Sequence, residues 1–355
     1  MKRILVVLPN WFGETLFATP FLKILRRQQP EAFIATLGWP QCREVLLHSP
    51  HVDELLTYDE RGIHRSLPGK ARVARMLRRA GFDTAFILRR SFSRTLLLWL
   101  AGIPARVGFA HAKSGWLLTR RVPISSRPQH KAFSYLPLLE AVGLSTARER
   151  YEYTLSGEER QAARQLLERS RLLDHGRPLV ILHPSANWPH KRWAAEAFAA
   201  LGDRLIETRQ VQVVITGGPA DQPLAESIRA RMQHPSALLA GRTTLRELGA
   251  CLEQARLVVS NDTGILHIAA ALGRPLVALY GPTSPLLTGP LGDAQRMRVL
   301  HHPDCCPRIP CYQPNQPPHP GMSSITVDEV YDAACQLLEA GSWKPEAGTE
   351  HRSHG

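Results

Sequence analysis

The sequence predicts an α/β protein with two doubly wound, Rossmann-like domains. Its 355 residues exceed the roughly 100 to 200 residues of an ordinary domain, which favours two. Short β-branched apolar runs alternate with segments of helical periodicity along the chain, as in parallel α/β proteins. Hydrophobic residues make up 44% of the chain and charged residues 21%, which is typical of globular proteins.

The first half contains five apolar runs that we expect to form strands. They are residues 4–8, 32–37, 54–58, 84–88 and 106–109. The clearest helices between them are residues 15–27, 71–80 and 93–101. Gly81 and Gly102 directly follow the last two helices, and glycine suits the left-handed position at which many helices end.

The second half repeats this alternation. Strands are expected at residues 179–183, 211–216, 257–260, 276–280 and 297–300, and helices at 193–207, 224–232, 245–255 and 265–272. The polar segment 156–171 has helical periodicity, and residues 327–338 form a closing helix. We therefore predict an N-terminal Rossmann-like domain at 1–155, a connecting segment at 156–178, a C-terminal Rossmann-like domain at 179–322, a closing segment at 323–340 and a disordered tail at 341–355.

Positive charge is concentrated in the first half. The formal net charge is +13, and sixteen Lys or Arg accompany one acid, Asp83, between Arg61 and Lys131. This bias favours a polyanionic partner such as nucleic acid, anionic lipid or a phosphorylated substrate. The alternative is an ordinary solvated surface.

The N-terminus does not have the pattern of a signal peptide. Met1-Lys2-Arg3 precede an apolar run that is short, and Pro9 and Asn10 follow it with no cleavage-like site. The longest apolar stretch, residues 96–103, is far below the roughly 20 residues that span a bilayer. We expect a cytoplasmic or membrane-peripheral protein.

Six cysteines in so long a chain do not indicate a disulfide framework. Cys305, Cys306 and Cys311 cluster in a segment rich in Pro and His. A zinc site there would need a fourth ligand from His301, His302 or His319, but the spacing matches no familiar pairing of two-residue-spaced cysteines. We therefore expect no metal and interpret the cluster as a peculiarity of the loop.

A phosphate-binding pattern follows the expected strand 257–260. Asp262 and Thr263 occupy the N-cap region of the next helix, where Gly264 allows close approach to the backbone. The free amides and the helix dipole at such a terminus attract phosphate. Thr263 and His267 are four residues apart and share a helix face. The alternative is a capped helix with a buried histidine whose hydrogen bonds are satisfied.

Three loops together resemble a known family. The run from Ser260 to Pro285, the run from His183 to Trp193 and the segment Asn10-Trp11-Phe12-Gly13-Glu14 are similar to those of the bacterial ADP-heptose:lipopolysaccharide heptosyltransferases, glycosyltransferase family 9. The resemblance implies the GT-B fold, with two Rossmann-like domains, an active site in the cleft between them and a donor held mainly by the C-terminal domain.

The resemblance also implies roles for individual residues. The residues that would bind an ADP-sugar donor are Ser185, Ala186, Gly218, Thr243, Thr244, Asp262, Thr263, Gly264 and His267. Asp221 is a weaker candidate beside the nucleotide. Lys191 would neutralise the leaving diphosphate, so the reaction would need neither a metal nor another cofactor.

The transfer also needs a base for the acceptor hydroxyl. Where the family usually has Gly-Asp, this chain has Gly13-Glu14, whose carboxylate reaches one methylene further. A misplacement of about 1 Å can cost around a hundredfold in rate, so the loop must compensate if Glu14 is the base. The alternative for Glu14 is an acid that only stabilises a helix N-terminus.

The family's acceptor is a phosphorylated lipid, which gives the basic residues of the first half a purpose. The residues expected to attract it are Arg61, Arg65, Lys70, Arg89, Arg90, Arg94, Lys113, Arg120 and Arg121. Each basic residue close to an anionic membrane contributes on the order of 1 kcal/mol, so we expect peripheral contact with the inner face of the inner membrane. Arg75, Arg78 and Arg79 are interpreted as the solvated face of a helix.

The sequence therefore predicts an inverting transferase that moves heptose from ADP-heptose to the lipopolysaccharide inner core. Two alternatives stay open: a related transferase with another nucleotide sugar or acceptor, and a catalytically silent sugar-nucleotide binding protein. Nucleic acid is not an expected partner, because no interleaved aromatic and basic motif is present. A Rossmann oxidoreductase is disfavoured because Pro9-Asn10-Trp11-Phe12-Gly13 replaces the Gly-x-Gly-x-x-Gly loop.

Overall fold

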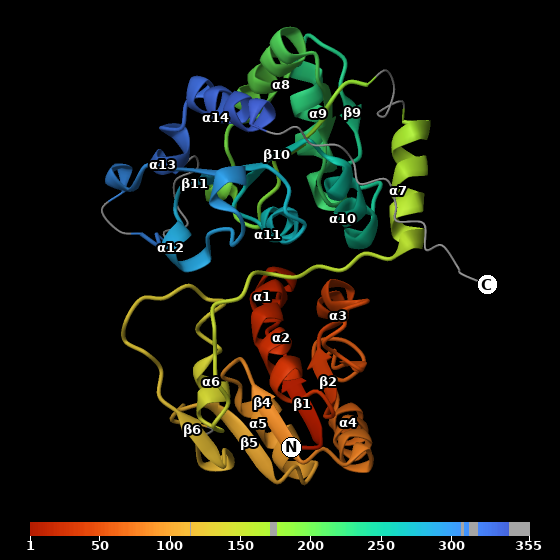
Figure 1. Ribbon diagram of the computed structural model, residues 1–355, viewed down its shortest axis with the longest axis vertical. Helices are drawn as coiled ribbons and strands as arrows, with labels where there is room; N and C mark the ends of the chain where they lie inside the picture. Colours follow the sequence, from red (N-terminus) through yellow and green to blue (C-terminus); the bar gives the residue numbers. More distant parts are fainter. Residues whose placement is uncertain (114, 171–175, 307–308, 312–318, 341–355) are drawn as a thin grey trace, which may run out of the picture. The chain divides into compact units, whose positions relative to one another are not determined.

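The computed structural model describes residues 1–113, 115–170, 176–306, 309–311 and 319–340. The expected tail, 341–355, and residues 171–175 of the connecting segment lie outside the described residues. The described chain forms two compact units (Figure 1). The first comprises residues 1–159, 262–272 and 283–292, and the second comprises the described residues of 160–261, 273–282 and 293–340.

The first unit contains a six-stranded sheet in the order β3-β2-β1-β4-β5-β6, with every pair parallel. Its strands are β1 (Arg3–Val7), β2 (Phe33–Gly38), β3 (Glu54–Thr57), β4 (Thr84–Ile87), β5 (Ala105–Phe109) and β6 (Arg120–Val122). Its helices are α1 (Phe12–Phe17), α2 (Thr19–Gln28), α3 (Pro40–Leu46), α4 (Leu67–Ala80), α5 (Phe92–Leu100), α6 (Pro137–Glu140), α11 (Gly264–Ala271) and α12 (Pro285–Thr288), with a 3₁₀ turn, η1 (Gly115–Leu117). This strand order is that of the dinucleotide-binding fold.

The first helix differs from the expectation of one helix over residues 15–27. The structure has two, α1 and α2, with the break at Ala18. Pro20, in the first turn of α2, has no N–H to continue a helical ladder. The hydroxyl of Thr19 donates instead to the carbonyl of Leu16 at 2.7 Å.

The helix expected at 71–80 begins four residues earlier, at Leu67. Ser66 caps it, because its hydroxyl accepts a hydrogen bond from the N–H of Gly69, and Pro68 occupies the first turn. Gly81 (φ 65°) and Gly102 (φ 76°) adopt the left-handed conformation, which confirms the expected helix ends.

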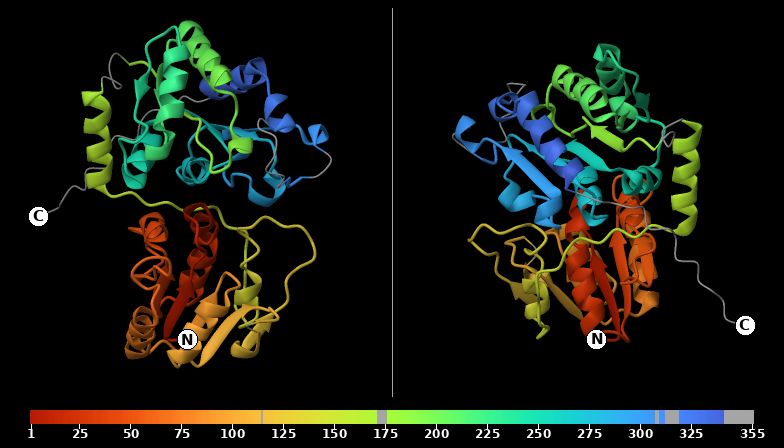
Figure 2. Two further views of the ribbon diagram at one scale, coloured as in Figure 1. Left: turned by 180° about the vertical axis from the view of Figure 1, so that it is seen from behind. Right: turned by 45° about the horizontal axis from the view of Figure 1, so that its top comes forward.

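The second unit contains another parallel six-stranded sheet, in the order β12-β11-β10-β7-β8-β9. Its strands are β7 (Leu179–His183), β8 (Gln212–Ile215), β9 (Ala237–Leu238), β10 (Leu257–Asn261), β11 (Leu276–Tyr280) and β12 (Met297–His301). Its helices are α7 (Gly157–Arg169), which begins within the first unit, α8 (Ala195–Arg209), α9 (Gln222–Arg231), α10 (Leu245–Gln254), α13 (Pro320–Ser323) and α14 (Val327–Glu339), with 3₁₀ turns η2 (Pro189–Lys191), η3 (Pro219–Asp221), η4 (Ala294–Arg296) and η5 (Pro303–Cys305). Helices flank each sheet in every view (Figures 1 and 2).

The edge strands β6 and β9 and the short helices α3 and α6 were not expected from the sequence. β6 and β9 have three and two residues, too few for an alternating pattern to stand out. The central strands were expected because they are buried on both faces and form continuous apolar runs. β7, β10 and β11 are buried at every position.

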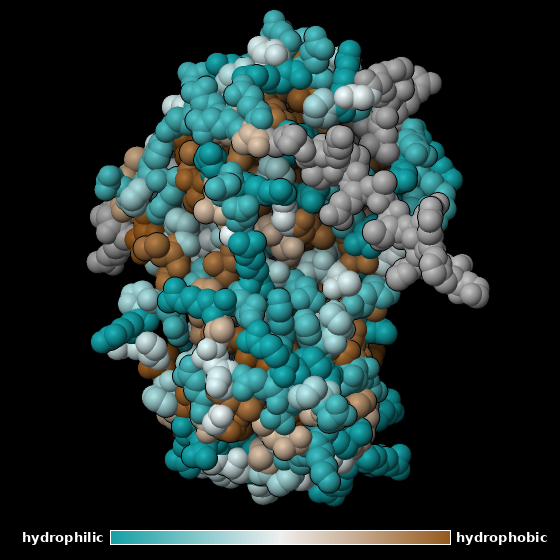
Figure 3. All heavy atoms as spheres, viewed as in Figure 1, coloured by the Kyte–Doolittle hydropathy of each residue, from teal (hydrophilic) through white to brown (hydrophobic). Residues whose placement is uncertain are grey.

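No helix among the described residues combines the length and apolarity needed to cross a membrane. On the face shown in Figure 3, hydrophilic side chains predominate and hydrophobic ones form smaller groups between them.

The carboxyl end of β7 carries a buried histidine, His183. Its Nδ1 lies 2.9 Å from the hydroxyl of Thr216, and only 3% of the residue is exposed. Burial lowers the pKa of His183 to about 4, because the charged ring would lose its hydration, while the charge of Asp221 acts weakly in the opposite direction.

We therefore expect His183 to make the free energy of unfolding depend on pH. Because the pKa is depressed in the folded state, its stabilising effect is complete above the unfolded pKa near 6.5 and is lost as the pH falls toward 4. The loss amounts to about 3 kcal/mol. Denaturant unfolding of the wild type and of His183→Gln at pH 7 and pH 4.5 measures it. The wild type should lose more stability than the variant on acidification, and equal losses would contradict the assignment.

Candidate functional site

The loop after β7 carries Ser185 and Ala186, and one carboxylate holds it in place. Asp221 accepts hydrogen bonds from the hydroxyl of Ser185 at 2.6 Å and from the N–H of Gly218 at 3.0 Å. A Cβ on Gly217 would lie 2.8 Å from the Cβ of Asp221, so the neighbouring loop needs glycine there. Asp221 therefore joins the loops after β7 and β8, and orients two of the predicted donor residues.

A buried amide fixes the same loop from its other side. Asn261, at the end of β10, donates from Nδ2 to the carbonyl of Pro184 at 2.8 Å and accepts from the N–H of Trp193 at 3.2 Å. Asn261 has no exposed surface, so both bonds form in a medium that strengthens them. The carboxyl ends of β7 and β10 are adjacent in the sheet, which brings these residues together.

Lys191 ends the 3₁₀ turn η2, which lies between the two ends of the loop that Asn261 holds. Its Nζ lies 5.5 Å from the ring centroid of Trp188, within the range of a cation–π contact. The next residue, Arg192, donates to the carbonyl of Ala186 at 3.0 Å and contacts Asp221 at 3.4 Å. Two cationic side chains therefore flank the loop, which suits an anionic ligand.

Thr243 and Thr244 precede α10 and differ in what they offer. Thr244 is the N-cap: its hydroxyl accepts from the N–H of Glu247 at 3.2 Å, and the carboxylate of Glu247 accepts from the N–H of Thr244 at 2.8 Å. The hydroxyl of Thr243 is buried and has no hydrogen-bond partner among the described residues. Thr243 is therefore the more available of the two for a ligand.

Asp262 and His267 lie at the start of α11, in the first unit. The carboxylate of Asp262 accepts a hydrogen bond from the hydroxyl of Thr283 at 2.7 Å, and its other oxygen lies 3.9 Å from Nε2 of His267. The ring of His267 packs against Phe17 and Tyr151, with centroids 4.8 and 5.8 Å apart. Asp262 and His267 are both buried, so the arrangement is a positioned polar pair within aromatic packing.

The glycines of the two helix starts lie against each other within the first unit. A Cβ on Gly13 would lie 3.3 Å from Cα of Gly264, and a Cβ on Gly264 would collide with the ring of Phe12. Thr263 is the N-cap of α11, and Glu14 is in the first turn of α1. The close backbone approach therefore brings the predicted phosphate-binding terminus beside the helix that carries Glu14.

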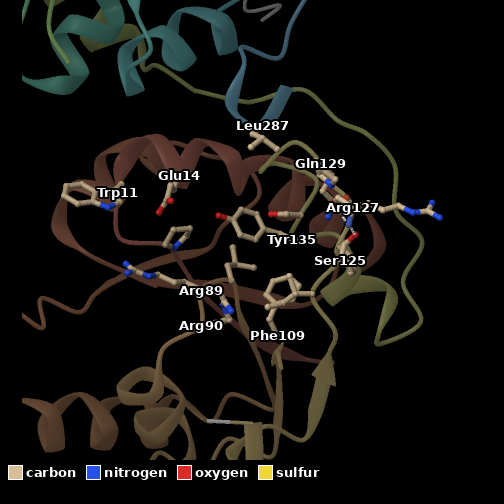
Figure 4. A pocket seen from close by; sticks show the side chains of 16 residues that line it. Trp11, Glu14, Arg89, Arg90, Phe109, Ser125, Arg127, Gln129, Tyr135 and Leu287 are labelled. Carbon is tan, nitrogen blue, oxygen red and sulfur yellow. Dashed lines mark hydrogen bonds between the residues drawn. The ribbon is translucent and has the colours of Figure 1, made fainter. Parts of the chain in front are cut away.

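A pocket of about 460 Å³ opens beside Glu14 in the first unit (Figure 4). It lies where the loops follow β1, β4 and β5, the expected place for a ligand in a parallel sheet. The residues that line it and are labelled in the figure are Trp11, Glu14, Arg89, Arg90, Phe109, Ser125, Arg127, Gln129, Tyr135 and Leu287. The pocket therefore combines aromatic surface, three guanidinium groups and one carboxylate.

The carboxylate of Glu14 and the hydroxyl of Tyr135 point toward each other across the pocket (Figure 4). Burial raises the pKa of Tyr135, and the charge of Glu14 raises it further, so its hydroxyl stays protonated as a donor. Lys131 Nζ lies 3.4 Å from a carboxylate oxygen of Glu14. Glu14 is thus a carboxylate at the pocket with a cation beside it.

The basic residues expected to attract an acceptor are not all in one place. Arg89 and Arg90 line the pocket. Arg61 stacks on the ring of Trp39, 4.6 Å from its centroid, and Trp39 packs against Trp11 at the pocket rim. The remaining exposed or partly exposed residues of the group lie elsewhere on the first unit: Arg65, Lys70, Lys113, Arg120 and Arg121.

Arg94 does not lie on the surface, and the expectation that it belongs to a basic surface is wrong. Only 1% of the residue is exposed, and its guanidinium donates to the carbonyl of Leu8 at 2.6 Å and to Glu60 at 3.1 Å. It follows Ser91, the N-cap of α5, on the side of the helix that faces the sheet. Arg94 therefore connects the loop after β1, through Leu8, with the loop after β3, through Glu60.

Arg127 and Tyr135, which line the pocket, and Lys131, whose Nζ lies 3.4 Å from Glu14, were not singled out from the sequence. Arg127 and Lys131 belong to the basic stretch, but they lie in an irregular segment without a motif, and Tyr135 is an isolated aromatic residue. The sequence contained only one signal for them, the one-sided charge that ends at Lys131. In the second unit the bridging roles of Asn261 and Asp221 were likewise decided by tertiary contacts.

Comparison with known proteins identifies the family of this chain. Residues 70–316 match the model of the family described as glycosyltransferase family 9 (heptosyltransferase). Lipopolysaccharide heptosyltransferase 2 of Salmonella typhimurium is 30% identical over 304 residues, which cover 83% of this chain and 87% of that protein.

Two solved structures share the whole fold. A glycosyl transferase family 9 protein from Veillonella parvula superposes with a TM-score of 0.86 at 26% identity, covering 96% of this chain and 98% of that one. E. coli ADP-heptose lps heptosyltransferase II superposes with a TM-score of 0.80 at 28% identity, covering 96% and 99%. The prediction of a GT-B fold is confirmed. The chain is a glycosyltransferase, and it belongs to glycosyltransferase family 9, the heptosyltransferases.

Proposed function

We propose that this protein transfers heptose from ADP-heptose to the inner core of lipopolysaccharide with inversion at the anomeric carbon. The observation that carries the proposal is the pocket of the first unit, which is lined by one carboxylate, Glu14, and by Arg89, Arg90 and Arg127. A base beside several anion-binding groups suits a phosphorylated sugar acceptor. The names of the similar proteins support heptose as the transferred sugar.

The donor diphosphate would be held by backbone and cationic groups. In the second unit, the loop of Ser185 and Ala186 offers amides, and Lys191 offers charge. These groups would stabilise the negative charge that develops as the diphosphate leaves. The proposed reaction therefore proceeds without a metal ion or other cofactor.

We expect ADP to bind the purified protein and Lys191→Ala to weaken that binding. Loss of one charge-assisted contact to phosphate corresponds to an affinity lower by about 10- to 100-fold. Calorimetric titration with ADP and ADP-heptose measures it, and transfer should be abolished in the variant. Arg229→Ala, an exposed cation in the last turn of α9, is the matched control and should bind normally. If neither nucleotide binds the wild type, the proposed donor is wrong.

Glu14 would be the base. In the proposed step its carboxylate takes the proton of the acceptor hydroxyl, the new bond forms between that oxygen and the anomeric carbon, and the bond from this carbon to the diphosphate breaks to release ADP. Its helix, α1, begins at Phe12 and is fixed by the approach of Gly13 to Gly264. Lys131 would hold the carboxylate in place through their ion pair.

We expect Glu14→Gln to lower kcat by about 10²- to 10⁴-fold, because the amide cannot accept the proton. ADP binding should be unchanged, since Glu14 does not contact the nucleotide in this proposal. Transfer to a lipid-linked acceptor is followed by mass spectrometry, and calorimetry measures donor binding.

Glu31→Gln removes an exposed carboxylate outside the pocket and serves as the control. Glu14→Asp should keep more activity than Glu14→Gln because it retains a carboxylate. Full activity in Glu14→Gln would show that Glu14 only stabilises the N-terminus of α1, and full activity in Lys191→Ala as well would refute the mechanism.

The acceptor would lie in the pocket with its phosphate on the guanidinium groups. Arg89 and Arg127 are both exposed and line the pocket, so they can reach an anionic group that enters it. Tyr135 would donate to an oxygen of the acceptor, because its raised pKa keeps the hydroxyl protonated.

We expect Arg89→Ala to raise KM for a phosphorylated acceptor by about 10-fold and to change kcat less, because a binding contact is lost while the base stays. Arg79→Ala removes an equally exposed cation from the last turn of α4 and should leave KM unchanged. For an acceptor without phosphate, KM should be the same for the wild type and for Arg89→Ala. If Arg79→Ala and Arg89→Ala have the same effect, the pocket has no special role in acceptor binding.

The protein would work in the cytoplasm as a peripheral protein on the inner face of the inner membrane. Arg65, Lys113, Arg120 and Arg121, outside the pocket, supply exposed charge that would favour an anionic bilayer. We therefore expect the protein to bind vesicles that contain anionic lipid and not to bind neutral vesicles.

Two other functions are separated by simple measurements. A different acceptor, such as another glycan or a protein, predicts an unchanged lipopolysaccharide core in a deletion strain, whereas the proposed function predicts loss of heptose. A catalytically silent protein would bind ADP-heptose without consuming it under any condition.

A further inference from the structure

Three metal-ligating side chains meet in the second unit. The ligand atoms of Cys306, Cys311 and His319 all lie within 4.8 Å of one another. Cys306 follows η5, Cys311 lies in the loop that leads toward α13, and His319 is the N-cap of α13. The three residues come from separate parts of the chain segment, so their convergence results from folding rather than from a short local motif.

His319 lies on the buried side of this cluster. Only 5% of the residue is exposed, and its Nε2 is buried with no hydrogen-bond partner among the described residues. Its Nδ1 accepts a hydrogen bond from the N–H of Gly321 at 3.1 Å. An imidazole nitrogen that is buried without a partner carries a cost of about 1 to 3 kcal/mol, which a ligand would offset. Coordination through Nε2 would move the ring proton to Nδ1 and exchange the contact with Gly321 for a bond to the metal.

The group does not extend to His301, the last residue of β12. Nε2 of His301 is also buried without a partner among the described residues, but the three ligand atoms within 4.8 Å of one another are those of Cys306, Cys311 and His319.

The surrounding backbone is tied to the same place. The N–H of Cys311 donates to the carbonyl of Pro282 at 2.7 Å. A Cβ on Gly321 would lie 3.4 Å from Gly281, and a Cβ on Gly281 would collide with Met322, so the start of α13 packs directly on the residues that follow β11. The cluster therefore lies between three segments that are already in contact.

We propose that Cys306, Cys311 and His319 form a structural binding site for a zinc ion. Two thiolates and one imidazole are ligands that Zn²⁺ prefers, and a water molecule completes the tetrahedron. The ion displaces one proton from each thiol on binding. It braces the loop after β12 against α13 and the residues that follow β11.

This proposal revises the interpretation of the cysteine cluster. The sequence argued against zinc because the five-residue step from Cys306 to Cys311 and the eight-residue step to His319 match no familiar spacing. Spacing rules describe ligands on one turn or one hairpin. Here the ligands come from the residue that follows a 3₁₀ turn, a loop and a helix cap, which the fold brings together.

The test uses the full chain, purified under reducing conditions, loaded with Zn²⁺ and desalted. We expect it to retain about one equivalent of zinc per chain by elemental mass spectrometry, because two thiolates and an imidazole hold the ion firmly. The Cys306→Ser/Cys311→Ser double variant and His319→Ala should each lose that equivalent. Cys305→Ser is the matched control, since Cys305 is the exposed neighbour outside the cluster, and it should retain the ion.

Cobalt gives a second readout that needs no variant. Co²⁺ added to the reduced wild-type chain should produce thiolate-to-metal charge-transfer bands and the strong visible bands of tetrahedral cobalt, and Zn²⁺ should remove both. A wild-type chain that holds no stoichiometric zinc and shows no cobalt–thiolate bands overturns the proposal. So does zinc retention in the folded Cys306→Ser/Cys311→Ser variant. Because metal content is measured without a transfer assay, either result leaves the proposed function to be judged separately.

Discussion

The buried side chain of Asn261 is the contact on which the donor side of this protein depends. It ends β10 and holds both ends of the loop that follows β7, at Pro184 and at Trp193. A loop held at two points by bonds in a water-free interior loses most of its freedom when the domain folds, not when a ligand arrives. Ser185, Ala186 and Lys191 all lie on that loop, so their positions follow from one amide.

The charges around this loop are also arranged by a few contacts. Asp221 binds Ser185, Gly218 and Arg192, so a single carboxylate organises the turn after β7 and the turn after β8. Without it, Arg192 would add an unpaired cation to an already basic protein. With it, the cation is directed along the loop, where it also holds the carbonyl of Ala186. The donor loop is thus a preorganised electrostatic site, which is the arrangement that stabilises a departing anion most strongly.

In the first unit, the close approach of two backbone segments is as important as the contacts of Asn261 are in the second. Gly13 and Gly264 lie at the starts of α1 and α11, and side chains there would separate the two helices. The approach places Glu14 next to a helix N-terminus and at the edge of the pocket that contains Arg89 and Tyr135. Buried Arg94 supports the loops around this pocket from below, because its guanidinium holds the carbonyl of Leu8. The sequence predicted that Arg94 binds the acceptor, whereas in the structure this buried residue supports the loops around the pocket.

The amino-acid sequence by itself determined the class of fold, the central strands and the family, because continuous apolar runs, glycine helix ends and contiguous loop motifs are local properties. It also singled out Glu14 and Lys191, which lie within such motifs. The tertiary structure alone decided which charges share a site. Arg127, Lys131 and Tyr135 join Glu14 from a segment without periodicity, Arg94 is buried, and Cys306 meets His319 across thirteen residues. The physical reason is that burial and convergence depend on contacts between segments distant in sequence, and local pattern does not record those contacts.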